Sequence, residues 1–207
     1  MFSIIQAAGW PIWFLLLASV IAVALIIERG TALRRNKVVP QGLLQGVVAD
    51  VRKGPVKEEG LRRLEAHSPL GLVFAAGLRN LSSSRDVMKE AVEEAGRGVA
   101  HDLDGHVGGV NLLQLLGTVA SIAPLMGLFG TVVGMIEIFG SATGAGNNPQ
   151  ALAHGISVAL YNTGFGLLIA IPSMIFYRHF RSLVDSFIVD MEQQAVKLVE
   201  LLHDERK

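Results

Sequence analysis

Three long stretches of this chain contain no Asp, Glu, Lys or Arg, and this segregation of charge constrains the fold more than any other feature. The stretches are residues 1–27, 107–136 and 138–177. Charged residues make up only 17% of the chain, whereas a soluble domain has about 25%, and nearly all of them lie in the remainder. A charge at the centre of a bilayer costs about 2.5 kcal/mol or more, so the pattern predicts a membrane protein.

The charge-free stretches predict three transmembrane helices, at residues 10–27, 111–138 and 152–177. About 20 apolar residues are needed to cross the ~30 Å hydrocarbon core of a bilayer, and each range comes close to that number or exceeds it. The first range is interpreted as an anchor rather than a cleaved signal peptide, because its basic residues follow the apolar run instead of preceding it. The predicted fold class is therefore an all-α membrane protein with three spans.

Basic residues near the ends of the spans predict the orientation of the chain. They follow the first and third spans: Arg29, Arg34, Arg35, Lys37, Arg178 and Arg181. The positive-inside rule then places residues 28–110 and 178–207 in the cytoplasm. The N-terminus, residues 1–9, and the turn-rich loop 139–151 are expected on the periplasmic side.

The cytoplasmic residues are predicted to be helical, with long helices that extend from the second and third spans. Helix starts are expected at Pro40, at Ser68-Pro69 and near Ser83, and the last of these helices should run to His106 and into the second span. The tail, residues 178–207, has apolar residues at three- and four-residue steps, which is typical of an amphipathic helix. No breaker separates it from the third span, so we expect one helix of roughly 50 residues, ~75 Å long.

Small residues form a stripe along the second span and another along the third. The stripes consist of Gly117, Ser121, Pro124, Gly127, Thr131 and Gly134, and of Gly155, Ala159, Asn162, Gly166, Ala170 and Ser173. Such stripes let helices approach closely, and this assigns Gly127, Gly130 and Gly134 to helix packing. Pro124 and Pro172 favour kinks. One interpretation is that the spans simply pack on each other; the other is that two full stripes exceed what three helices need, which favours a homo-oligomer.

Polar side chains within the spans are candidates for a polar path: Thr131, Thr163, Ser157 and Asn162. The alternative for each hydroxyl is a hydrogen bond back to a carbonyl of its own helix. Neither span has a carboxylate near its middle. Glu137 lies at the outer end of the second span, and His154 lies at the outer end of the third. Proton relays in membranes are usually marked by an ionisable residue, so a partner helix must supply that group if the chain takes part in proton conduction.

Other functional classes are disfavoured by composition. A net charge of zero argues against nucleic-acid binding, and the absence of cysteine excludes thiol catalysis and thiolate metal sites. We expect no catalytic residue, no metal and no cofactor, because we find no histidine pair at metal spacing on one helix, no phosphate-binding loop and no carboxylate cluster. The protein is therefore not expected to be an enzyme. The alternative to a channel is a passive oligomeric scaffold in the membrane.

Two segments resemble the second- and third-span signatures of the MotA/TolQ/ExbB proton-channel family. They are residues 122–136, IAPLMGLFGTVVGMI, and residues 155–173, GISVALYNTGFGLLIAIPS. Glu28-Arg29 after the first span also fits. The resemblance covers essentially the whole chain, and its size and topology suit the ExbB/TolQ branch better than the larger MotA branch.

The resemblance implies a motor in the bacterial inner membrane that uses the proton-motive force. Five copies would surround a pair of ExbD- or TolR-like single-span partners whose aspartate carries the proton. Force would pass to a TonB- or TolA-like protein that spans the periplasm. Thr131 and Thr163 match the family's pore-lining threonines. Val158 stands where many members have glutamate, which leaves Thr131, Thr163, Asn162 and the partner's aspartate to organise the path.

Overall fold

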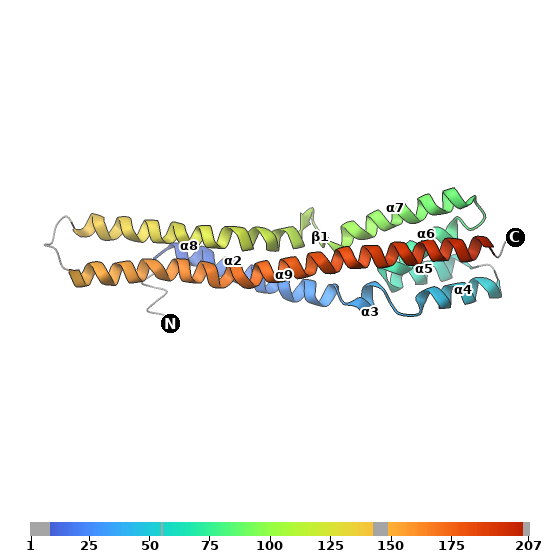
Figure 1. The fold of residues 1–207 in the computed structure, drawn as a ribbon, viewed down its shortest axis with the longest axis horizontal. Coiled ribbons are helices and arrows are strands. Elements are labelled where there is room, and N and C mark those ends of the chain that lie inside the picture. The colour runs from blue at the N-terminus through green and yellow to red at the C-terminus, as the bar shows by residue number, and fades with distance from the viewer. Residues whose placement is uncertain (1–8, 55, 143–148, 205–207) are drawn as a thin grey trace. The chain divides into compact units, whose positions relative to one another are not determined.

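Three helices of the protein are long and apolar enough to cross a membrane (Figure 1). They are α2 (Pro11–Ala32), α8 (Leu112–Ala142) and α9 (Pro149–Asp204) in a computed structural model that describes residues 9–54, 56–142 and 149–204. The prediction of an all-α protein with three spans is confirmed.

The chain divides into two units. Residues 1–28 and 112–179 form the first, here called the span unit, and residues 29–111 and 180–207 form the second, here called the polar unit. α2 and α9 each begin in the span unit and end in the polar unit. The charge-free stretches thus correspond to one compact unit and the charged remainder to another.

In the span unit, one face of α2 is buried and the other is apolar but exposed. The buried side chains recur at helical spacing: Ile12, Leu15, Ala22 and Leu25. The exposed large side chains are Trp13, Phe14, Leu17, Val20, Val23 and Ile27. An apolar surface of this extent is typical of contact with lipid or with another helix. Trp10 packs edge-on against Phe129 of α8, with ring centroids 5.9 Å apart.

The helices α8 and α9 both extend beyond the spans predicted from the sequence. Both continue as helix through their internal prolines, Pro124 and Pro172. The predicted periplasmic loop 139–151 is shorter at both ends, because α8 runs to Ala142 and α9 begins at Pro149. The rest of that loop, like residues 1–8 of the predicted periplasmic N-terminus, lies outside the described residues.

The polar unit is built around the apolar helix α6 (Pro69–Arg79), which packs against α3 (Arg35–Val38), α5 (Glu58–His67) and α7 (Arg85–Leu103). The predicted start at Ser68-Pro69 is confirmed, since the Ser68 hydroxyl accepts a hydrogen bond of 3.1 Å from the Gly71 amide. The buried side chains of α6 include Leu70, Val73, Phe74 and Leu78.

The remaining starts differ slightly from the prediction. The helix expected at Pro40 is α4 (Leu43–Lys53), which ends before Gly54 as predicted. The helix expected near Ser83 has Ser84 as its N-cap, with the Ser84 hydroxyl accepting from the Val87 amide at 3.4 Å. The helix α5, over residues 58–67, is not among the predicted helices.

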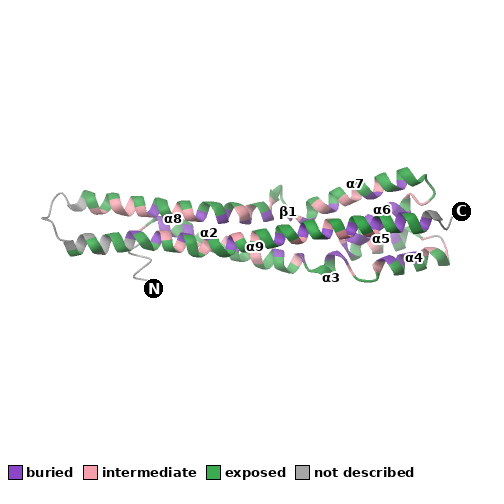
Figure 2. Ribbon diagram, viewed as in Figure 1, coloured by how far each residue is buried: buried purple, intermediate pink, exposed green. Residues whose placement is uncertain are grey.

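The tail forms one helix with the third span, as predicted, and α9 is 56 residues long. Figure 2 shows buried residues recurring along its C-terminal part. They are Phe180, Val184, Phe187, Met191, Ala195, Leu198, Val199 and Leu202. This stripe is the apolar face that the three- and four-residue spacing predicts, and it supplies much of the core of the polar unit.

The expectation that one helix runs to His106 and into the second span is wrong. α7 ends at Leu103, and a short hairpin of β1 (His106–Val107) and β2 (Val110–Asn111) separates it from α8. The physical reason is the backbone at Gly105, Gly108 and Gly109, whose φ angles are +80°, +58° and +82°. Only glycine adopts such angles readily, so these three glycines end the helix and turn the chain.

Candidate functional site

The candidate site is the interface between α8 and α9 within the span unit, where the two backbones approach closely at Gly127 and Gly166. A Cβ added at Gly127 would lie 2.7 Å from the Asn162 carbonyl oxygen, and one added at Gly166 would lie 2.6 Å from the Ala123 carbonyl oxygen. Gly134 faces Ala159, with a corresponding distance of 3.2 Å to its Cβ. Gly127 and Gly134 therefore lie where α8 approaches α9 closely.

The two stripes of small residues pack on each other. On α9 the described members of the stripe are all buried: Ala159, Asn162, Gly166, Ala170 and Ser173. Three of them, Ala159, Asn162 and Gly166, lie against Ala123, Gly127, Gly130 and Gly134 of α8. Part of the α8 stripe thus packs on the α9 stripe within one subunit, whereas Ser121 of the α8 stripe is exposed.

Asn162 is a deeply buried polar side chain of the site, with 1% of its surface exposed. It fills the space beside Gly130, where an added Cβ would lie 2.7 Å from Asn162 Cβ and Cγ. There is therefore no room for a side chain at position 130, because the Asn162 side chain occupies the neighbouring volume. The structure places Asn162 between α8 and α9 rather than on an outer face.

Thr163 carries a buried hydroxyl at the same level of α9. Thr163 Oγ1 is shielded from solvent and has no hydrogen-bond partner among the described residues. A buried hydroxyl without a partner costs about 1–3 kcal/mol, so such groups call for a role or a ligand such as water. Of the three hydroxyls of the predicted polar path, which all lie in the described part of the chain, this is the one that the helices themselves leave unsatisfied.

The other predicted hydroxyls bond back to their own helices. Thr131 Oγ1 donates to the Leu128 carbonyl at 2.6 Å, and Ser157 Oγ donates to the Ala153 carbonyl at 2.9 Å. Thr131 is half-buried and Ser157 is exposed. Each oxygen keeps its lone pairs as acceptors, so this bond leaves both groups able to bind water. The side chain of Val158, the fifth residue of the predicted path, lies outside the described residues.

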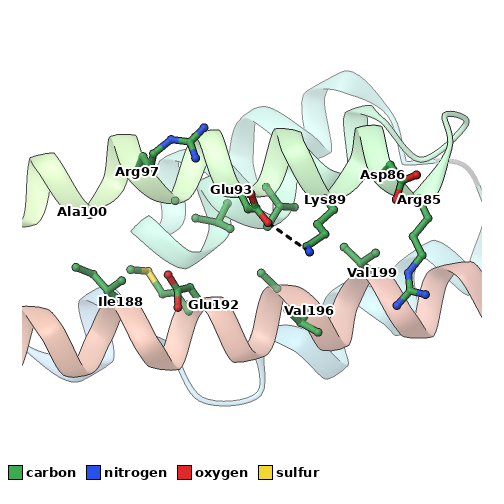
Figure 3. A pocket seen from close by; sticks show the side chains of 15 residues that line it. Arg85, Asp86, Lys89, Glu93, Arg97, Ala100, Ile188, Glu192, Val196 and Val199 are labelled. Carbon is green, nitrogen blue, oxygen red and sulfur yellow. Dashed lines mark ion pairs between the residues drawn. The ribbon is translucent and has the colours of Figure 1, made fainter.

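A separate groove lies in the polar unit between α7 and α9 (Figure 3). It has a volume of about 660 Å³, with apolar residues including Val92, Met191 and Val199 and with charged residues such as Lys89 and Glu93, which pair at 3.7 Å. Sequence reasoning missed this groove, since it depends on how two distant segments pack. Among the described residues, no three His, Cys, Asp or Glu side chains come together in a way that could hold a metal ion.

The polar unit also contains an exposed ion-pair cluster between α5 and α6. Arg79 contacts Glu58 at 2.8 Å and Glu65 at 2.7 Å. The hydrogen bond from Arg79 holds the pKa of Glu58 below its ordinary value. The residues of this cluster belong to α5 and α6, and we interpret the cluster as a structural contact between these two helices.

Comparison with known proteins identifies the family of the chain. Residues 65–193 match the MotA/TolQ/ExbB proton channel family. The chain belongs to this family. The matched residues include Gly127, Asn162 and Thr163, so the site described above lies within the part of the chain that matches the family.

Named members of the family are similar over most of the chain. The biopolymer transport protein exbB1 of Vibrio cholerae is 32% identical over 82% of this chain and 74% of its own length. The putative biopolymer transport protein ExbB-like 3 of Synechocystis is 30% identical over 90% of this chain and 89% of its own. The Tol-Pal system protein TolQ of Pseudomonas aeruginosa is 29% identical over 98% of this chain and 92% of its own length. The chain is thus a multi-pass membrane protein of the ExbB/TolQ branch.

Proposed function

We propose that this chain is a subunit of a motor in the bacterial inner membrane that is driven by the proton-motive force. Membership of a proton channel family supports this proposal. The single structural observation that carries it is the buried Thr163 hydroxyl without a partner between two tightly packed spans. A chain of hydrogen-bonding groups through apolar helices provides a route for a proton that lipid does not.

In the proposed path, Thr131, Ser157 and Thr163 offer hydroxyl oxygens to water or to a proton donor, and Asn162 fixes the two helices behind them. The position of Val158 in α9 gives this subunit no carboxylate at that point of the path. The spans have no Asp or Glu from Val107 to Ile136 or from Ile138 to Tyr177. The titrating group therefore comes from a partner, and we assign this role to the aspartate of an ExbD- or TolR-like single-span protein.

We further propose that five copies form a ring around a pair of these partner helices. The exposed apolar side chains of α2, α8 and α9 supply the surfaces for neighbouring copies and for lipid. The N-terminus is periplasmic and the C-terminus cytoplasmic, in keeping with the basic residues that follow α2's apolar run and the third span. The complex energises a TonB- or TolA-like protein in the periplasm, for transport or for maintenance of the envelope.

The competing proposal is a passive oligomeric scaffold, and the back-bonded hydroxyls of Thr131 and Ser157 are what favours it. Thr163→Val separates the two proposals, because valine keeps the shape of threonine and removes its hydroxyl. A motor should lose proton flux and keep its assembly, whereas a scaffold should keep its function. Thr163→Ser retains a hydroxyl and should retain flux. Thr118→Val, at an exposed threonine of α8 bonded to the Gln114 carbonyl at 2.9 Å, controls for loss of a hydroxyl outside the proposed path.

Two further measurements test the architecture of the motor. Thr131→Leu should block the path by bulk, and unimpaired proton-dependent activity in that variant would remove Thr131 from the pore. Native mass spectrometry of the chain co-expressed with the aspartate-bearing partner should give a complex of five copies with two partners. A ring that excludes the partner would favour the scaffold.

A further inference from the structure

All three spans lead into one cluster of contacts inside the polar unit. We call this cluster the collar, and it consists of Arg29, Gly30, Leu103, Asp104, Gly105, Asn111, Phe180 and Arg181. Arg29 and Gly30 belong to the end of α2, Asn111 directly precedes α8, and Phe180 and Arg181 belong to α9. Leu103, Asp104 and Gly105 form the junction between α7 and the hairpin.

Arg29 is the centre of the collar. Only 5% of its surface is exposed, which is rare for an arginine. Its guanidinium donates a hydrogen bond of 3.2 Å to the carbonyl of Leu103, the last residue of α7. A buried cation requires such compensation, because the loss of its hydration costs several kcal/mol. The end of α2 is thereby fixed to the end of α7.

Gly105 is shaped to receive this guanidinium. A Cβ on Gly105 would overlap Nη1 and Cζ of Arg29. Gly105 also has a φ of +80°, so two independent features demand glycine at this point. The arginine therefore packs directly against the backbone where the chain leaves α7 and enters the hairpin.

The other contacts of the collar join the remaining elements. Arg181 Nη1 of α9 lies 3.7 Å from Asp104 Oδ2, and the side-chain Nδ2 of Asn111 donates to the same oxygen at 3.5 Å. A Cβ on Gly30 would be 3.7 Å from Phe180 Cζ, so α2 also passes close to α9. The residues that lead into all three spans are thus tied to one another through neighbouring side chains.

We propose that Arg29 is the positioning residue of this collar, and that the collar makes the subunit stiff enough for proton passage to do mechanical work. This inference rests on the proposed function. Close-packed interiors transmit strain because they have low compressibility, whereas loosely joined helices yield. A subunit without the Arg29 contact still conducts protons through α8 and α9. Its helices then shift relative to one another at the collar, and the movement that accompanies proton passage is not transmitted to the driven protein.

The contact itself is tested by a double-mutant cycle on the full chain in detergent. Gly105→Ala and Gly109→Ala impose the same backbone strain, since both glycines have φ near +80°, but a Cβ on Gly109 meets nothing within 4 Å. Gly105→Ala should therefore lower the Tm more than Gly109→Ala does. This excess should disappear when Arg29 is changed to alanine in both variants. If the excess loss of Tm in Gly105→Ala is the same with Arg29 present as with Arg29 changed to alanine, the assignment is overturned.

The mechanical role is tested in the complex with the aspartate-bearing partner, with Arg34→Ala as control because Arg34 is an exposed arginine nearby. In Arg29→Ala, proton flux per assembled complex should stay within about twofold of the control, while restoration of envelope function in a deletion strain falls about tenfold. Equal envelope function in both variants, or a parallel loss of flux and function, would overturn the proposal.

If Arg29→Ala does not accumulate, Arg29→Lys replaces it, since lysine keeps the charge but lacks the planar guanidinium; the same split between flux and envelope function is expected, and its absence contradicts the proposal. If the unaltered complex carries no proton flux, the proposed function fails. The mechanical role of Arg29 then falls with it, whereas the Gly105 cycle still decides whether the contact exists.

Discussion

Replacing Gly127 by alanine should weaken the packing of α8 on α9. A Cβ at this position would lie 2.7 Å from the Asn162 carbonyl oxygen and 3.0 Å from Thr163 Cα, whereas ordinary contact begins at 3.4 Å. Both neighbours are backbone atoms of α9, and they cannot rotate away as the end of a side chain can. The two helices must therefore separate or shift along the whole interface to admit one methyl group.

Overpacking of this kind costs about 1–3 kcal/mol. Gly164 offers a matched control on α9, because a Cβ there meets nothing within 4 Å. Alanine at Gly164 should be neutral, or should stabilise the helix by up to about 1 kcal/mol through its higher helix propensity. The free energies of unfolding of the two variants should thus differ by at least about 1–3 kcal/mol, with Gly127→Ala the less stable.

The assay is unfolding in mixed micelles with increasing sodium dodecyl sulfate. Energy transfer between dyes on cysteines introduced into α8 and α9 would report the separation of the helices, and labelling is specific because the chain has no cysteine of its own. Identical midpoints for Gly127→Ala and Gly164→Ala would refute the close approach of the two spans.

Three more changes test the polar unit. Ser68→Ala removes the oxygen that accepts from the Gly71 amide and should lower stability by about 1 kcal/mol; an unchanged denaturation midpoint would show that the cap is dispensable. Gly96→Ala should stabilise α7 by about 0.5–1 kcal/mol, because a Cβ there points into open space beside the groove, and a lower Tm would mean that the groove is filled in solution. The pKa of Glu58 is held below 4.5 chiefly by its hydrogen bond with Arg79. The stabilisation from this pair is therefore full above pH 4.5 and is lost as the pH falls through the lowered pKa, so Glu58→Gln should lower the Tm near neutral pH and have less effect in acid; a pH-independent difference contradicts this.

Charge segregation and helical spacing were sufficient to predict the large features of the fold. The cost of a charge in lipid predicts where the spans lie, and the spacing of Phe180, Val184, Phe187 and Met191 predicts the buried face of the tail. Both signals are local and strong, because each depends on many residues at once. The cap at Ser68 was equally predictable, since a serine before Pro69 satisfies an amide that the first turn leaves unpaired.

The hairpin and the pairing of the stripes were not predictable by the same reasoning. Strands of two residues are too short to show a period, and the signal was in the glycines at 105, 108 and 109 rather than in the apolar pattern. The small residues of α8 and α9 were evident in the sequence, but their spacing does not say which surface they face. The burial of Arg29 was equally hidden, because only the fold brings it to Leu103 and Gly105.

Proton uptake into liposomes tests the central claim most directly. The purified complex of this chain with the proposed aspartate-bearing partner would be reconstituted, and a membrane potential would be imposed across the bilayer. The account predicts proton flux through the complex, and none through this chain alone or through a complex whose partner aspartate is changed to asparagine. Flux through the chain alone, or flux that is unaffected by the asparagine substitution, would contradict the proposal that the partner supplies the titrating group.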